Sequence, residues 1–201
     1  MPLNELADSA ELKHRIRRLV SVVRSIAVHM IAEGQNSTDS ALHLAGRVGA
    51  IGRAAVAPIS SGMDLESLLL DELVAQGVQR APILINGPSV RLNAKSAELI
   101  SLAIHELVTN AIKFGALSQP QSRLRVVWWF TGPRNSRLHF EWVEEDVRIA
   151  ADARRSPGFG SQVVKRLIAS ELRGNGDMQF SSKGITCTIE IPSSEALLQN
   201  E

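Results

Sequence analysis

The first part of the chain carries apolar residues at alternating steps of four and three. They are Leu12, Ile16, Leu19, Val23, Ile26 and Met30. This a/d spacing of a heptad predicts a helix over residues 10–32. A polar break at 36–40 offers capping side chains for a second helix that runs to about Ala57. The pattern therefore predicts a helical hairpin.

A single hairpin buries its apolar seam poorly. Pairing with a second copy would enclose the seam in a four-helix bundle, so the pattern predicts a homodimer.

The periodicity changes after Gly62, where short apolar strands alternate with amphipathic helices. The expected helices cover 64–76, 95–115 and 161–172, and the expected strands cover 82–86, 89–92, 124–130, 138–143, 178–182 and 186–191. Helices on one face of a mostly antiparallel sheet form an α+β layer. We therefore predict two domains, with the hairpin over 1–60 and an α/β sandwich over 61–201.

Composition excludes several classes of protein. The 201 residues are 44% hydrophobic and 21% charged, with a net charge of +1, which gives no sign of bulk nucleic-acid binding. The apolar runs are shorter than the roughly 20 residues of a membrane span. Cys187 is the one cysteine and cannot form an internal disulfide, so a reducing cytoplasm is the expected location. It is expected to be a core residue.

The stretch HELVTNAIKFGA places three polar side chains on an otherwise apolar helix. Glu106, Asn110 and Lys113 lie at i, i+4 and i+7, so they share one face. Such a line is most often a solvated face. A carboxylate and an amide oxygen are also suitable Mg²⁺ ligands, and a lysine can meet a phosphate. Spacing alone leaves both interpretations open.

Four motifs in order resemble those of the HWE branch of histidine kinases, over about residues 10–192. HELVTNAIKFGALS resembles the N-box, with Phe114 where Tyr is usual, and FEWVE at 140–144 resembles the WxE signature. GFGSQVVKRLIASELRG at 158–174 resembles the second glycine-rich box, and ELKHRIRRLVSVVRSIA at 11–27 resembles the phosphoacceptor helix. The resemblance implies a phosphoacceptor hairpin followed by a histidine-kinase/gyrase-like ATP-binding domain.

The N-box resemblance assigns ATP and Mg²⁺ as cofactors. It implies that Asn110 is a Mg²⁺ ligand, that Glu106 holds a metal-bound water or accepts a proton, and that Lys113 contacts phosphate. His105 stands at the position of the histidine that gives the HWE branch the first letter of its name.

The other two boxes imply the rest of the nucleotide site. Trp142 and Glu144 stand at the positions of the tryptophan and glutamate that give the branch the other two letters of its name. Glu144 also stands where other histidine kinases place the aspartate that binds the adenine amino group. Gly158 and Gly160 would let backbone N–H groups approach the phosphates ahead of a helix.

His14 is the phosphoacceptor that the resemblance implies. On the heptad count it falls at f, facing away from the seam, within reach of two successive partners. Basic neighbours (Lys13, Arg15, Arg17 and Arg18) would favour a phosphoryl group there. The implied reaction is in-line attack of imidazole on the γ-phosphorus of ATP, followed by transfer to an aspartate of a response-regulator receiver domain.

The chain departs from the family pattern in two places. Lys13, Arg17 and Arg18 differ from the usual residues around the phosphoacceptor, and 145–148 (EDVR) replaces a Gly-Gly-Pro segment, with Asp146 adding an anion near the expected nucleotide. Three functions follow as alternatives. They are an ATP-dependent protein-histidine kinase, a non-catalytic histidine phosphotransfer protein with a degenerate ATP domain, and a scaffold that binds regulators without chemistry.

Only nine residues precede the first predicted helix, which leaves no room for a sensor domain. The sequence is therefore expected to be either a piece of a longer kinase or a short protein that takes its signal from a separate sensor protein.

Overall fold

The computed structural model describes Ile16, Val20, Val23 and residues 38–55, 62–78, 82–148, 158–181 and 184–198. The three single residues are helical, and helix α2 spans Thr38–Ala55. The chain divides into two units between Val48 and Gly49, so the last turns of α2 belong to the second unit. His14 and most of the first predicted helix lie outside the described residues.

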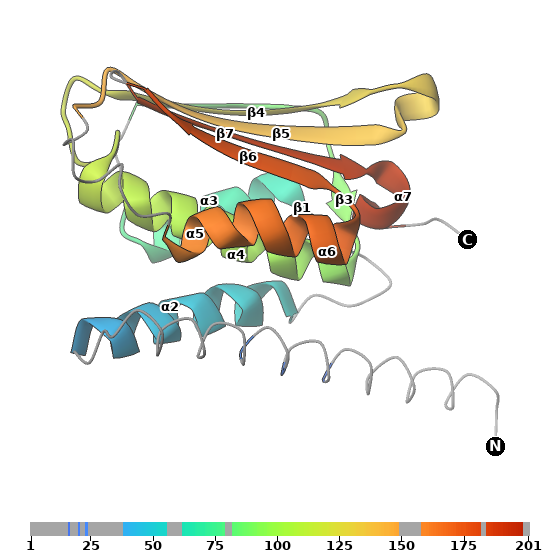
Figure 1. Cartoon of the computed structure of the whole chain (residues 1–201), viewed down its shortest axis with the longest axis horizontal. Helices are drawn as coiled ribbons and strands as arrows, with labels where there is room; N and C mark the ends of the chain where they lie inside the picture. Colours follow the sequence, from blue (N-terminus) through green and yellow to red (C-terminus); the bar gives the residue numbers. More distant parts are fainter. Residues whose placement is uncertain are drawn as a thin grey trace. The chain divides into compact units, whose positions relative to one another are not determined.

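A five-stranded sheet forms one layer of the second unit, in the order β2-β4-β5-β7-β6 (Figure 1). The strands are β2 Ile83–Asn86, β4 Arg123–Thr131, β5 Arg137–Glu145, β6 Asn175–Phe180 and β7 Gly184–Pro192. All neighbouring pairs are antiparallel except β2 and β4, which are parallel. The predicted α+β class with a mostly antiparallel sheet is therefore confirmed.

Helices cover one face of this sheet (Figure 1). They are α3 Leu65–Ala75, α4 Ala94–Phe114 and a continuous helical segment made of α5 Phe159–Gln162, a π-helical stretch Val163–Leu167 and α6 Ile168–Leu172. The sequence predicted this last segment as one regular helix. The strands β1 Met63–Asp64 and β3 Arg91–Leu92 form a separate small sheet, and α7 Ser193–Ala196 follows β7.

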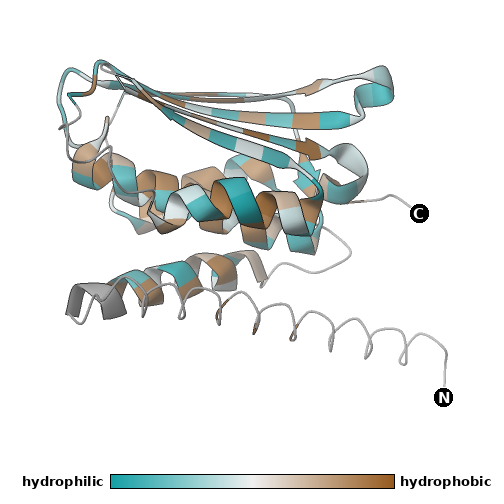
Figure 2. Cartoon of the chain, viewed as in Figure 1, coloured by the Kyte–Doolittle hydropathy of each residue, from teal (hydrophilic) through white to brown (hydrophobic). Residues whose placement is uncertain are grey.

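Alternating side chains build the core between the sheet and the helices, as the banding along the strands shows (Figure 2). On β5 the inward positions are Leu138, Phe140, Trp142 and Glu144, all buried. Glu144 pairs with Leu124 and Ile185 on the flanking strands, so a carboxylate occupies a position where its neighbours are apolar. This position makes Glu144 the first candidate for a chemical role.

The predicted role of Cys187 as a core residue is confirmed. It is buried on β7, and this burial raises the pKa of its thiol to about 12, so it is not a reactive thiolate. Within the described residues, every helix is too short or too polar to cross a bilayer.

Candidate nucleotide site

Helix α4 carries the N-box residues and has a well-defined start. The side chain of Asn93 accepts a hydrogen bond from the Ser96 backbone N–H at 2.9 Å and caps the first turn. The helix ends at Phe114, and Gly115 follows. It lies at the centre of the core, with every residue from Ser96 to Val108 buried.

Glu106 and Asn110 face the second glycine-rich box. A Cβ placed on Gly160 would lie 2.9 Å from Glu106 Cβ and 3.5 Å from Asn110 Nδ2, so the backbone of the box packs directly on these two residues. Glu106 is only 7% exposed, which a solvated helix face does not explain, whereas Lys113 two turns further on is exposed. The structure thus brings together two motifs that are 50 residues apart in the sequence.

The two glycines of GFG have different surroundings. Gly158 precedes the helical segment with φ −69°, is exposed, and has open space where a Cβ would stand. Gly160 is buried in the first turn, where a Cβ would collide with Glu106. Only Gly160 therefore has a packing reason to be glycine.

The carboxylate of Glu144 lies against the C-terminal end of α4. Its Oε2 accepts a 2.7 Å hydrogen bond from the Ala116 N–H, and its Oε1 accepts a 3.0 Å bond from the indole N–H of Trp142. A Cβ on Gly115 would overlap this carboxylate, so the glycine at the helix end makes room for it. The WxE motif and the end of the N-box are thus one hydrogen-bonded unit.

Burial dominates the electrostatics of Glu144. Removal from water raises the pKa of this carboxyl above its ordinary value, and the hydrogen bonds from Trp142 and Ala116 offset only part of that increase. Glu144 consequently ionises less readily than an exposed glutamate.

The segment that replaces Gly-Gly-Pro keeps a sharp bend without glycine. Asp146 adopts φ +59°, a left-handed conformation that glycine adopts freely and aspartate tolerates. Its carboxylate pairs with Arg123 at 3.0 Å, and its carbonyl accepts a 3.0 Å hydrogen bond from Ser122. Val147 is buried. The added anion of Asp146 is thus paired with a cation of β4.

The donors present fit a magnesium ion that is bound mainly through a nucleotide. Asn110 and Glu106 offer hard oxygen ligands, and the described part of the chain contains no cluster of three or more His, Cys, Asp or Glu side chains for a metal. Mg²⁺ is commonly held by one or two protein oxygens together with phosphates and waters. The residues here match that kind of site better than an all-protein metal cage.

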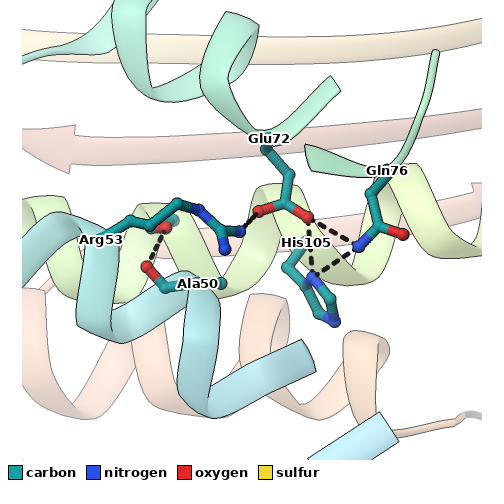
Figure 3. Close-up of polar contacts among 6 residues, drawn as sticks. Ala50, Arg53, Glu72, Gln76 and His105 are labelled. Atoms are coloured by element: carbon teal, nitrogen blue, oxygen red, sulfur yellow. Dashed lines mark hydrogen bonds and ion pairs between the residues drawn. The ribbon is translucent and has the colours of Figure 1, made fainter. Parts of the chain in front are cut away.

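Sequence reasoning missed a buried polar cluster on the other side of α4 (Figure 3). Nδ1 of His105 lies 2.8 Å from Oε1 of Glu72 on α3, and Glu72 also pairs with Arg53 on α2. Gln76 donates to the same Glu72 oxygen at 2.9 Å. Burial by itself would raise the pKa of Glu72, but the hydrogen bonds from His105 and Gln76 and the charges of His105 and Arg53 lower it overall. The signal available in the sequence was that Glu72 shares a face of the α3 helix with Leu65 and Leu68.

Comparisons with known proteins agree with these motifs. The family model described as HWE histidine kinase matches residues 11–89. A blue-light-activated histidine kinase 1 of Erythrobacter litoralis is 28% identical over 193 residues, which is 92% of this chain and 52% of the relative. A blue-light-activated histidine kinase of Rhizobium johnstonii is 29% identical over 189 residues, 91% of this chain and 52% of the relative. The chain thus spans about half the length of these relatives.

The fold has a counterpart among solved structures. The histidine kinase domain of an Erythrobacter litoralis blue-light-activated histidine kinase superimposes with a TM-score of 0.61 at 20% identity, covering 92% of this chain and 91% of that domain. The chain is therefore similar in sequence to HWE histidine kinases, in the four motifs and over residues 11–89, and similar in fold to a histidine kinase domain.

Proposed function

We propose that the chain is an ATP-dependent protein-histidine kinase of a two-component system, which phosphorylates its own His14 and passes the phosphoryl group to an aspartate of a response-regulator receiver domain. The observation that carries this proposal is the packing of Gly160 on Glu106 and Asn110. It joins the helix that would hold the metal to the loop that would hold the phosphates.

In this proposal the N-box supplies the phosphate end of the site. Asn110 would hold Mg²⁺, which would neutralise phosphate charge, and Glu106 would hold a water on that metal or accept a proton. Lys113, exposed at the end of α4, contacts a phosphate. Backbone N–H groups at Gly158 and Gly160 approach the phosphates at the start of the helical segment.

Glu144 would accept a hydrogen bond from the adenine amino group. Each oxygen accepts one hydrogen bond, from Trp142 or from Ala116, and a carboxylate oxygen has two lone pairs, so an acceptor position remains for a base. The two existing bonds fix the carboxylate in one orientation, which favours selection of a particular donor.

The chemical step is assigned to His14. An imidazole nitrogen attacks the γ-phosphorus in line, the bond to the β,γ-bridging oxygen breaks, and ADP leaves. Transfer to a receiver aspartate then regenerates the imidazole.

The hairpin over 1–60, with the ATP-binding domain over 61–201, is proposed to form a homodimeric four-helix bundle. Support comes from apolar side chains of the predicted seam that are exposed in the single chain. They include Ile16 (51% exposed), Leu42 (66%) and Val48 (41%). A partner copy would cover such a seam. We place the protein in the cytoplasm, with its signal arriving from further sequence or from a separate sensor protein.

The test is incubation with γ-labelled ATP and Mg²⁺. We expect acid-labile label on the wild-type chain and none on His14→Ala or Asn110→Ala. Label that resists acid, or that persists in His14→Ala, would contradict the assignment.

One observation favours a second function, a non-catalytic histidine phosphotransfer protein with a degenerate ATP domain. The family glycines are absent from 145–148, and Val147 fills buried space there. In that case ATP gives no label, while a phosphorylated receiver domain labels wild type and leaves His14→Ala unlabelled.

A further inference from the structure

Helix α4 presents a second polar line, distinct from the one that faces Gly160. Ser101 and His105 lie at i and i+4, and each is only 3% exposed. The Ser101 hydroxyl donates to the Ala50 carbonyl of α2 at 2.9 Å. His105 reaches Arg53, one turn further along α2, through the carboxylate of Glu72 (Figure 3).

These contacts join α4 to the end of α2 at two points. Ala50 and Ala54 on α2 are buried beside them, so apolar packing accompanies the polar contacts. Helix α2 is continuous from Thr38 to Ala55 and therefore leads from this anchored end into the hairpin unit.

The hydrogen-bond roles inside the cluster follow from its geometry. Gln76 donates its amide N–H to Oε1 of Glu72, and Nδ1 of His105 lies 2.8 Å from the same oxygen. A carboxylate only accepts, so the 2.8 Å contact requires the proton on Nδ1, which donates. The Gln76 amide nitrogen, 3.2 Å from Nδ1, is then a second donor beside it and makes no hydrogen bond to the ring. Glu72 thereby has Arg53 on one oxygen and His105 on the other.

We propose that His105 is a positioning residue, which acts through Glu72 and Arg53 to hold the last turn of α2 on the N-box helix. The proposal rests on the proposed kinase function for its consequence, because α2 leads to the segment that carries His14. Whereas the neighbouring Glu106 faces Gly160, the ring of His105 bonds to Glu72 of α3. Its loss should therefore impair phosphoryl transfer while leaving nucleotide affinity intact.

The decisive variants separate the Nδ1 donor from the bulk of the ring. In His105→Asn the side-chain amide nitrogen stands near the position of Nδ1, so the bond to Glu72 can form. His105→Gln places its amide one methylene further out, and His105→Leu removes the donor. Arg53→Met removes the other partner and keeps an apolar stem. Arg125→Met, which breaks the Arg125–Glu141 pair on the sheet, is the matched control.

Two readouts keep this proposal distinct from the kinase assignment. Hydrogen exchange of the amides in 50–55 reports the anchor directly, and leaving one buried partner unsatisfied should accelerate it about tenfold or more in His105→Leu and Arg53→Met. Labelling of His14 at saturating ATP should fall about 10- to 100-fold in the same variants, with the Mg-ADP dissociation constant unchanged. His105→Asn and Arg125→Met should resemble wild type in both.

Each alternative outcome is informative. Equal defects in His105→Asn and His105→Leu would overturn the assignment to Nδ1, and a parallel loss of Mg-ADP affinity would show a general structural role. If the wild-type chain takes no label from ATP, the kinase assignment fails, and exchange alone decides the anchor. Unchanged exchange in His105→Leu would then overturn it.

Discussion

Alanine substitution at the two glycines of GFG should have opposite effects, although the sequence presents them as equivalent. In Gly160→Ala the new Cβ would lie 2.9 Å from Glu106 Cβ, well inside the 3.4–4 Å of ordinary contact. The helical segment or α4 must move by several tenths of an ångström to relieve this contact. In Gly158→Ala the Cβ enters open space at φ −69°.

The expected magnitudes follow from these surroundings. Overpacking costs about 1–3 kcal/mol, and the gain of helix propensity from glycine to alanine offsets about 1 kcal/mol, so Gly160→Ala should lose up to about 2 kcal/mol. Gly158→Ala should gain about 0.4–1 kcal/mol, because alanine restricts the unfolded chain at a conformation it adopts without strain.

Urea unfolding measures both changes, and titration with Mg-ADP shows whether the displacement reaches the site. We expect Gly160→Ala to be the less stable variant and also the weaker nucleotide binder, because it pushes the glycine box away from Asn110. Equal stability of the two variants, or a more stable Gly160→Ala, would refute the proposed packing of the two boxes.

Three further changes test other features of the structure. At position 146, where φ is +59°, Asp146→Gly should be more stable than Asp146→Ala by about 1 kcal/mol in urea unfolding, the reverse of the usual order. Thr109→Val should stabilise by about 1 kcal/mol in the same assay, because the buried Thr109 hydroxyl has no hydrogen-bond partner among the described residues, and a loss of stability would reveal one. The pKa of Glu72 is lowered from 4.5, so its stabilising contribution is present above that value and disappears as the pH falls through the lowered pKa. Thermal unfolding of Glu72→Gln should consequently be less sensitive than wild type to acidification between about pH 5 and 3, and a parallel decline would contradict this.

Much of the fold was accessible from periodicity. The expected helix over 95–115 is α4 at Ala94–Phe114, and the expected helix over 64–76 is α3 at Leu65–Ala75, each with a side-chain cap that the sequence displays. Most strands also overlap the predicted ranges, although β6 begins at Asn175, three residues before the predicted 178–182, and β1 was not predicted. The parallel pairing of β2 with β4 was not predictable, because it depends on which edge of the sheet a short strand joins.

The sequence indicated which motifs form the site, but it did not indicate which side chains of those motifs contact one another. Spacing placed Glu106 and Asn110 on one face, and the family resemblance added Gly160, but neither shows that the glycine backbone rests on both side chains. Long-range packing of this kind depends on the whole core. The π-helical stretch over 163–167 is likewise set by tertiary packing, because VVKRL fits an ordinary helix.

The segment 145–148 forms a bend in the backbone although it contains no glycine. Asp146 adopts the left-handed conformation itself, and Ser122 and Arg123 contact it. Aspartate is among the few residues that tolerate this region of φ. His105 shows the opposite case, in which a residue named by the motif has partners on α2 and α3 that no motif marks.

The most direct test of the central claim is calorimetric titration of Mg-ADP into the wild-type chain and Asn110→Ala. The claim is that one face of α4 and the backbone at Gly160 form a magnesium–nucleotide site. We predict saturable binding to wild type that weakens strongly when EDTA removes Mg²⁺ and in Asn110→Ala. Absence of binding to wild type, or binding that is indifferent to both changes, would contradict it.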